Sequence, residues 1–221
     1  MRESAASLAA QTRPRAGAGE MSTQDDEVRP LIEQTLGQAL LTIARGAIGR
    51  KLGFRAVAEP KHDALAANAA TFVTLRRAGA LRGCIGSLDP VRPLGVDTRE
   101  NALAAAFRDP RFPPVSAAEY QATSVEVSLL SPRERIAFGS EHELLRCLRP
   151  GVDGVILEYD SHRATFLPQV WDSLADPRTF LVALKRKAGL PEDFWSVRVN
   201  VSRYRVTKWA ESEFLSSEMD R

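Results

Sequence analysis

Strand-like segments joined by connections of only a few residues are the feature that most constrains the fold of this chain. Residues 71–76 (TFVTLR) alternate apolar and polar side chains, and the turn RAGA separates them from residues 81–88 (LRGCIGSL). Residues 154–159 (GVILEY) and 164–167 (ATFL) are joined by a polar turn around Asp160 and Ser161. Connections this short join antiparallel strands, whereas parallel strands need a long crossover. The sequence therefore predicts two β-hairpins.

Helical patterns lie between these strands. From Val28 to Gly49 apolar residues recur every three or four positions, which predicts a helix with one buried face. Capping-box spacings predict the starts of three further helices: Asp97 with Glu100, Ser116 with Glu119, and Ser140 with Glu143. Asp176-Pro177 predicts the start of a final helix, because proline suits the first helical turn. Residues 124–130 (SVEVSLL) and 196–206 (SVRVNVSRYRV) each alternate as one strand. We predict an α+β fold, mainly an antiparallel sheet with flanking helices, in two lobes of unequal size.

The domain organisation is predicted to be simple. Residues 1–25 are rich in Ala, Gly, Ser and Arg without apolar periodicity, which predicts a disordered N-terminal extension. A transit peptide is the alternative, and Met21 is a second candidate start. Residues 26–215 are predicted to form a single domain with two lobes.

Composition narrows the class of protein. The formal net charge of the 221 residues is only +2, and no basic run is interleaved with aromatic residues, so nucleic-acid binding has little support. Arginine strongly outnumbers lysine, which suits an anionic ligand but is also the mark of a GC-rich genome. The apolar runs are too short to cross a membrane. The two cysteines have neither disulfide-framework nor zinc-site spacing, so we expect a reducing, cytoplasmic setting and no metal.

The stretch LRGCIG carries the strongest candidate for chemistry. Glycine weakens a strand, so Gly83 and Gly86 beside Cys84 imply that the chain bends or that something lies close to it. Alternation places Arg82, Cys84 and Gly86 on one face of the strand. Three interpretations stay open: a reactive thiol assisted by Arg82, a small buried hydrophobe chosen for packing, or a backbone surface against which a ligand lies with Arg82 pairing its anion.

Other candidate residues are more scattered. Glu126 points away from its apolar neighbours, and it or His62 is a candidate acid or base, although an outward glutamate is commonly just solvated. The proline-rich stretch DPRFPP, residues 109–114, predicts a rigid loop suited to binding. We predict that Arg82, Cys84, Gly86 and this loop line one cleft for an anion; the rival is a packing glycine and an internal Asp109–Arg111 pair. The candidate ligand-binding residues are Arg82, Gly83, Gly86, Asp109, Arg111, Phe112 and Gln169.

The order of several blocks resembles a known family. LRGCIGSL, ENALAAAFRDPRFPP, VEVSLLSP, GVDGVILE, FLPQVW and KRKAGLPEDFW are similar to the AmmeMemoRadiSam system protein A family, whose human relative is named for the Alport syndrome, midface hypoplasia and elliptocytosis region. The resemblance spans residues 30–206 and LRGCIG is the family hallmark. It implies a two-lobed α+β fold in a bacterial or archaeal setting, encoded beside a radical SAM protein and a Memo-like protein. It implies no particular reaction.

Three functions follow as expectations. The first is a binding or adaptor module for a small anionic ligand or a partner, acting with the radical SAM and Memo-like proteins. The second is an enzyme with Cys84 as nucleophile or redox thiol, Arg82 assisting, and Glu126 or His62 as acid or base. The third is a nucleotide or nucleic-acid binder. The cofactor is unknown, because no glycine-rich nucleotide motif and no three-cysteine cluster is found in the sequence.

Overall fold

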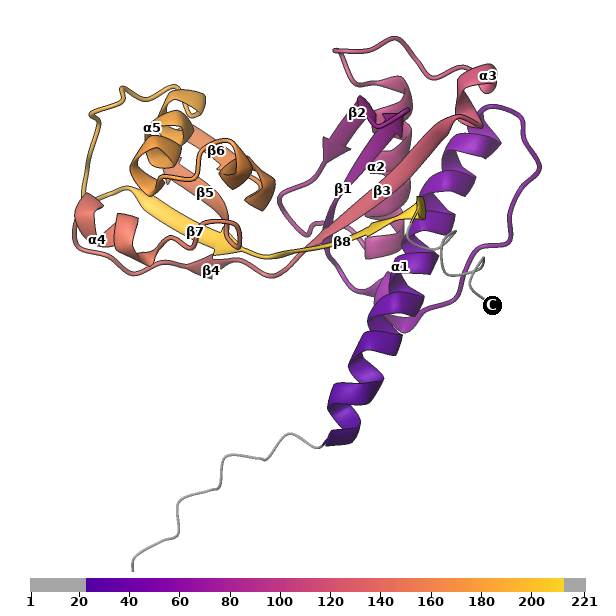
Figure 1. The fold of residues 1–221 in the computed structure, drawn as a ribbon, viewed down its shortest axis with the longest axis horizontal. Coiled ribbons are helices and arrows are strands. Elements are labelled where there is room, and N and C mark those ends of the chain that lie inside the picture. Colours follow the sequence, from indigo (N-terminus) through magenta and orange to yellow (C-terminus); the bar gives the residue numbers. More distant parts are fainter. Residues whose placement is uncertain (1–22, 213–221) are drawn as a thin grey trace, which may run out of the picture.

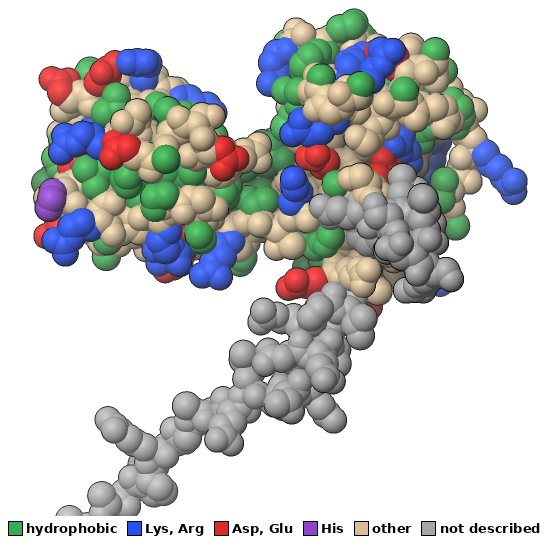
Figure 2. All heavy atoms as spheres, viewed as in Figure 1, with side chains coloured by type: hydrophobic (Ala, Val, Ile, Leu, Met, Phe, Trp, Pro, Cys, Tyr) green, Lys and Arg blue, Asp and Glu red, His purple; other side chains and the backbone are tan. Residues whose placement is uncertain are grey.

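The computed structural model describes residues 23–212, with side chains from residue 33 onward, and divides them into two lobes (Figure 1). Each lobe is built on an antiparallel sheet of four strands, in the order β2-β1-β3-β8 and β4-β7-β5-β6. Figure 2 shows the surface narrowing between the lobes. The α+β class and the antiparallel pairing predicted from the short connections are confirmed.

The first lobe holds the longest helix and the first hairpin. The elements are α1 (Thr23–Lys51), the 3-10 helix η1 (Asp63–Ala66), β1 (Ala70–Arg77), β2 (Ala80–Gly86), α2 (Leu94–Phe107), α3 (Ala117–Tyr120), β3 (Thr123–Leu130) and β8 (Val206–Ala210). Ala78 and Gly79 turn the hairpin with positive φ angles of 49° and 79°, as a tight turn that matches the twist of the strands requires. Both α1 and α2 lie on the side of the sheet away from the second lobe (Figure 1).

The second lobe is formed by residues of the middle of the chain and one returning strand. Its elements are β4 (Glu134–Arg135), α4 (Glu141–Cys147), β5 (Gly154–Tyr159), β6 (His162–Phe166), the 3-10 helix η2 (Pro168–Asp172), α5 (Pro177–Lys187) and β7 (Asn200–Tyr204). Ser140 and Asp176 cap α4 and α5 through side-chain hydrogen bonds, as their spacing predicted. The second hairpin turns at Asp160, whose φ is 48°.

Each lobe has its own core, and a third apolar cluster joins them. In the first lobe the inward residues of β1 and β3 are fully buried beneath α1 and α2, including Val73, Leu75, Val125 and Val127. The junction cluster pairs Ala70 and Leu130 of the first lobe with Ile156 and Tyr204 of the second. The junction residues come from the opposite face of the first sheet, so this face looks toward the second lobe.

Two sequence-based expectations need correction. The stretch 196–206 is not one strand: it breaks at Arg205, and β7 and β8 join different sheets. Asp97 does not cap a helix, because α2 begins earlier, at Leu94. The Asp97 carboxylate is instead buried, accepts hydrogen bonds from the backbone and hydroxyl of Thr71, and ties α2 to β1. The predicted 1–25 extension lies outside the described residues except for 23–25, which belong to α1.

Candidate functional site

The two glycines of LRGCIG are explained by close approach. A Cβ on Gly83 would lie 2.2 Å from the carbonyl oxygen of Ala105, because the alanine-rich α2 packs directly on β2 at this point. A Cβ on Gly86 would lie 2.2 Å from the ring of Phe72, its cross-strand partner. Gly86 therefore does not leave an open site, contrary to expectation, since an aromatic ring occupies that space.

Cys84 is held by its backbone at the edge of the first sheet. Its N–H donates to Asp109 Oδ2 at 2.8 Å, and its carbonyl accepts from Arg111 Nη2 at 3.2 Å. The half-buried thiol points to the face shared with Thr74, whose hydroxyl donates to Sγ at 3.3 Å. The loop DPRFPP thus fixes the edge strand by pairing the backbone groups that an edge otherwise leaves free.

Arg82 leaves the face of Cys84 because a β-bulge interrupts the hairpin. Leu75 pairs with Gly83 and Arg76 pairs with Leu81, so Arg82 has no cross-strand partner. Its buried guanidinium donates to Glu119 and to the carbonyl of Pro113. The expected common face of Arg82, Cys84 and Gly86 is therefore reduced to Cys84 and Gly86.

The charges around the loop are matched internally. Two hydrogen bonds from Arg111 hold the pKa of the buried Asp109 carboxyl well below its usual value, and the same bonds raise the pKa of Arg111. Hydrogen bonds from Arg82 lower the pKa of Glu119 to about 2. Both guanidiniums lie near the ring of Phe112, at 5.8 and 5.5 Å from its centroid. The structure gathers the predicted loop residues as expected, but it pairs each cation with a carboxylate of the chain.

A row of polar side chains crosses the half-buried face of the first sheet. Cys84, Thr74 and Glu126 are neighbours on β2, β1 and β3. Glu126 binds Arg76 at 2.8 Å, and Lys208 Nζ lies 4.0 Å from its other carboxylate oxygen. The Glu126 side chain is only 15% exposed, so it is an ion-paired group rather than a solvated one.

An open groove of about 410 Å³ begins beside this row, where the two lobes meet. Ser128 and Lys208 contribute to it from the first sheet, and Arg205 from the connection between β7 and β8. Gln169 contributes from η2, and the other lining residues are Gly151, Val152, Pro168 and Val206. Within residues 33–212, the side chains of Arg205, Gln169 and Ser128 form no hydrogen bond or ion pair with one another or with any other residue.

Four polar residues line the groove together. Arg205 and Lys208 are exposed cations, Gln169 carries an amide, and Ser128, whose residue is only 8% exposed, contributes from β3. Two cations, a serine and a glutamine therefore line one hollow between lobes, a common place for small-molecule sites.

Comparison with known proteins agrees with the motifs of the sequence. A sequence profile of the AMMECR1 family matches residues 41–209. The chain belongs to the AMMECR1 family. A protein of Methanothermobacter thermautotrophicus is 40% identical over 179 residues, which cover 77% of this chain and 91% of the relative. A protein of Thermofilum pendens is 40% identical over 173 residues, covering 72% of this chain and 81% of the relative.

The AMMECR1 fold is also seen in a solved structure. The crystal structure of an uncharacterized protein from Pyrococcus horikoshii matches with a TM-score of 0.71 and 36% sequence identity. The match covers 79% of this chain and 91% of the other. The family resemblance inferred from the motif blocks is confirmed.

Among the residues singled out from this AMMECR1 sequence, two groups form at different places. Gly83, Arg82, Asp109, Arg111 and Phe112 surround the edge of β2. Gln169 lies in the groove, and Glu126 lies next to it through Lys208. His62 belongs to neither group, since its ring accepts a hydrogen bond from Ala64 N–H and caps η1.

Sequence reasoning missed Ser128, Arg205 and Lys208. The alternation of β3 does place Ser128 on the face of Glu126, which was a usable signal. The position of Arg205 was concealed, because the alternation of 196–206 runs unbroken through the point where the chain changes sheets.

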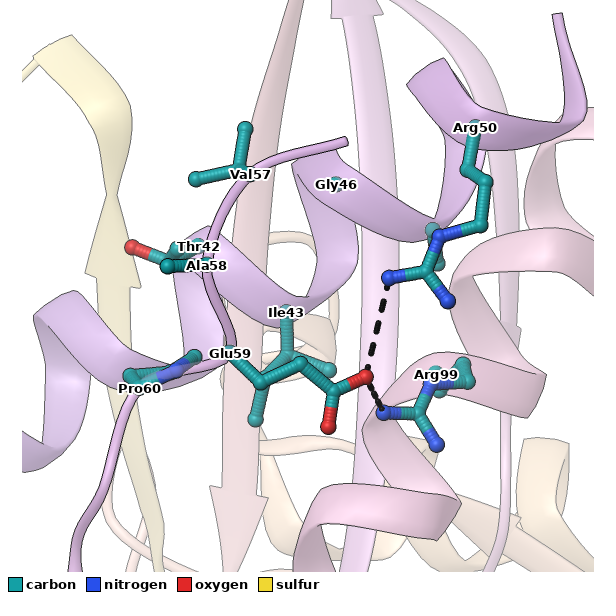
Figure 3. Close-up of a pocket in the computed structure, with 10 residues that line it drawn as sticks. Thr42, Ile43, Gly46, Arg50, Val57, Ala58, Glu59, Pro60 and Arg99 are labelled. Carbon is teal, nitrogen blue, oxygen red and sulfur yellow. Dashed lines mark hydrogen bonds and ion pairs between the residues drawn. The ribbon is translucent and has the colours of Figure 1, made fainter. Parts of the chain in front are cut away.

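Two further hollows are less suited to a ligand. Figure 3 shows one on the helical side of the first lobe, where Glu59 lies between Arg50 and Arg99 at 3.6 and 2.5 Å. Its volume of about 10 Å³ holds about one water molecule. Another hollow lies on the second lobe and is lined by two short segments that are mainly apolar, residues 135–138 and the pair Val197 and Val199. Across residues 23–212 no helix is both long and apolar enough to span a membrane.

Proposed function

We propose that this AMMECR1 chain binds a small anionic ligand in the groove between its lobes. The observation that carries the proposal is that two exposed cations, Arg205 and Lys208, line the same groove, and that the Arg205 guanidinium forms no hydrogen bond or ion pair with the other described residues. Charge-assisted hydrogen bonds from arginine and lysine to a carboxylate or phosphate are among the stronger polar contacts in proteins. Gln169 and Ser128 supply neutral donors at the same place.

The groove replaces the loop DPRFPP as the proposed anion site. Arg82 and Arg111 each donate to a carboxylate of this chain, and an incoming anion would have to displace it. Arg205 needs no such exchange, and Lys208 faces only a distant carboxylate oxygen at 4.0 Å. Binding in the groove therefore requires less reorganisation.

Titration with succinate and with inorganic phosphate, followed by backbone and side-chain NMR shifts, tests this proposal. We expect saturable shifts at Ser128, Gln169, Arg205 and Lys208, weakened about tenfold in Arg205→Gln, as loss of one charge-assisted hydrogen bond predicts. Arg178→Gln is the matched control, because Arg178 is exposed on α5 and is not among the residues that line this groove. Equal affinity in both variants, or shifts confined to the DPRFPP loop, would contradict the proposal.

Family membership supports a second element of the proposal, the partners. The resemblance implies genes for a radical SAM protein and a Memo-like protein nearby, so we propose that the bound anion is handled together with them. Copurification of the three proteins, with and without phosphate or succinate, tests this point. If the same amount of partner copurifies with Arg205→Gln as with the unmodified chain, partner binding does not depend on the groove.

A further inference from the structure

The groove between the lobes has apolar lining as well as charged lining. Val152 of the second lobe, Pro168 at the start of η2 and Val206 at the start of β8 all line it. Val206 also packs against the junction cluster, so apolar surface continues from the groove into the contact between the lobes. The cations Arg205 and Lys208 line the same groove. A small inorganic anion would use only the charged part of this lining.

The second-lobe wall of the groove is apolar and rigidly held. Val152 is 46% exposed, and the turn that carries it is fixed from behind by the fully buried Asp153. The Asp153 carboxylate accepts hydrogen bonds from the backbone N–H and the guanidinium of Arg149, at 3.0 and 2.6 Å. Trp171 Nε1 donates to the Asp153 carbonyl at 2.8 Å, which joins this turn to η2, where Pro168 lies. A preformed surface of this kind loses little freedom when a ligand binds to it.

The cations lie on the opposite wall. Lys208 and Val206 are two residues apart on β8, so they share one face of the first sheet. Leu130, the cross-strand partner of Val206, belongs to the junction cluster, so this face looks toward the second lobe. Arg205 lies where the chain passes from β7 to β8 (Figure 1). The groove therefore has charges along the first lobe and the connection, and a fixed apolar wall on the second lobe.

We propose that the anion bound in the groove is amphipathic, a carboxylate or phosphate joined to an apolar body of several carbon atoms. This inference rests on the proposed function, because Arg205 and Lys208 bind the head group, and it adds that Val152, Pro168 and Val206 contact the body. Small-molecule sites are typically lined by apolar residues with a few polar groups that fix orientation, and the volume of about 410 Å³ lies within their range.

The exposed valine and the cations together support this class of ligand. A single exposed valine is common on protein surfaces and needs no explanation by itself. Val152, however, lines a hollow that it shares with two cations, so one molecule can contact both kinds of surface. Because the apolar residues line a groove, they favour a free molecule that fits inside it over the surface of a membrane.

The test compares acetate with hexanoate, which share the carboxylate and differ by four methylene groups, in NMR titrations of the full chain. An open groove buries about half of each methylene group, which strengthens binding about twofold per group. We therefore expect hexanoate to bind about tenfold more tightly than acetate. Arg205→Gln should weaken both ligands about tenfold, because it removes a contact to the shared head group.

Val152→Ser tests the apolar wall. We expect it to weaken hexanoate binding about threefold more than phosphate binding, because only hexanoate has a body to contact this residue. Val91→Ser is the matched control: Val91 is 72% exposed and is not among the residues that line the groove, so the preference for hexanoate should be unchanged. The thermal unfolding midpoint shows that each variant is folded.

The outcomes separate this inference from the proposed function. If phosphate and acetate bind in the groove and hexanoate binds no more tightly, the amphipathic ligand is refuted and the anion site remains. A preference for hexanoate that is the same in Val152→Ser and Val91→Ser, or hexanoate binding that is insensitive to Arg205→Gln, also refutes it. If none of the three anions shifts the groove residues, both proposals are refuted. Cosedimentation with phosphatidylglycerol vesicles that is lost in Arg205→Gln would assign the groove to a membrane surface and overturn the free ligand.

Discussion

The contact of α2 with Gly83 makes a sharp test of how the hairpin is packed. In Gly83→Ala the new Cβ would lie 2.2 Å from Ala105 O, more than 1 Å short of ordinary contact, which begins at 3.4 Å. The obstacle is helix backbone rather than a flexible side chain, so α2 or β2 must move. Overpacking of this kind costs about 1 to 3 kcal/mol.

The size of the effect in melting temperature follows from the length of the chain. For domains of 150 to 250 residues, 1 kcal/mol shifts the midpoint by about 2 to 4 °C. We therefore expect Gly83→Ala to lower the thermal midpoint by about 2 to 12 °C, measured by circular dichroism and by calorimetry.

Gly46→Ala is the matched control because it makes the same chemical change with the opposite expectation. Gly46 lies inside α1, and the nearest atom to its added Cβ is Val57 Cβ at 3.9 Å. Replacing a glycine within a helix by alanine stabilises by about 1 kcal/mol. An unchanged or raised midpoint in Gly83→Ala would refute the close approach of α2. A lowered midpoint in Gly46→Ala would show that alanine is disfavoured at glycines generally.

Further predictions concern the buried carboxylates. The folded-state pKa of Asp109 is depressed, so its stabilising effect is present above the unfolded-state value of about 3.9 and is lost as pH falls toward the folded-state value. Urea unfolding between pH 3 and pH 7 should therefore show stability falling below about pH 5, with a shallower fall in Asp109→Asn; an identical fall would contradict the role of this pair. Asp97→Ala should lower the free energy of unfolding by about 1 to 3 kcal/mol, measured in urea at pH 7, because it leaves the Thr71 N–H buried without its acceptor; a loss near zero would contradict the tie between α2 and β1. Arg82→Met should remove the bonds from Arg82 to Glu119 and to the carbonyl of Pro113, and should lower the thermal midpoint without weakening phosphate binding, although Glu119 keeps its bonds to Arg77 and Ser116; a weakened affinity would restore Arg82 to the ligand site.

The local patterns predicted elements well because short-range chemistry decides them. The hairpin at Ala78 and Gly79, the cap at Ser116 and the cap at Asp176 depend on residues no more than four apart. The Ser116–Glu119 capping box forms as predicted, and Glu119 also binds Arg82 across 37 positions. That second role has no local signal.

The wrong predictions share a physical cause, which is competition from distant contacts. Asp97 has the right spacing for a cap, but burial beneath β1 gives it stronger partners in Thr71 and Asn101. The alternation of β2 failed to place Arg82 because a bulge inserts one residue, and Gly83 signals only that the chain bends or is closely approached, not where the extra residue lies. The groove was unpredictable for the same reason, since Gln169 and Ser128 come from different lobes.

The hallmark motif separates structural positions from chemical ones. Gly83 makes room for α2, Gly86 for Phe72, and Arg82 anchors the loop through Glu119 and Pro113. Within LRGCIG, the Cys84 thiol lies on the face of the sheet that carries the proposed site, and this residue does not make room for a packed element as the two glycines do. Substitutions at the other motif positions will therefore report chiefly on folding, even where they abolish activity. Variants of Arg205 and Lys208, whose side chains are exposed at the groove, separate ligand binding from stability and carry the functional test.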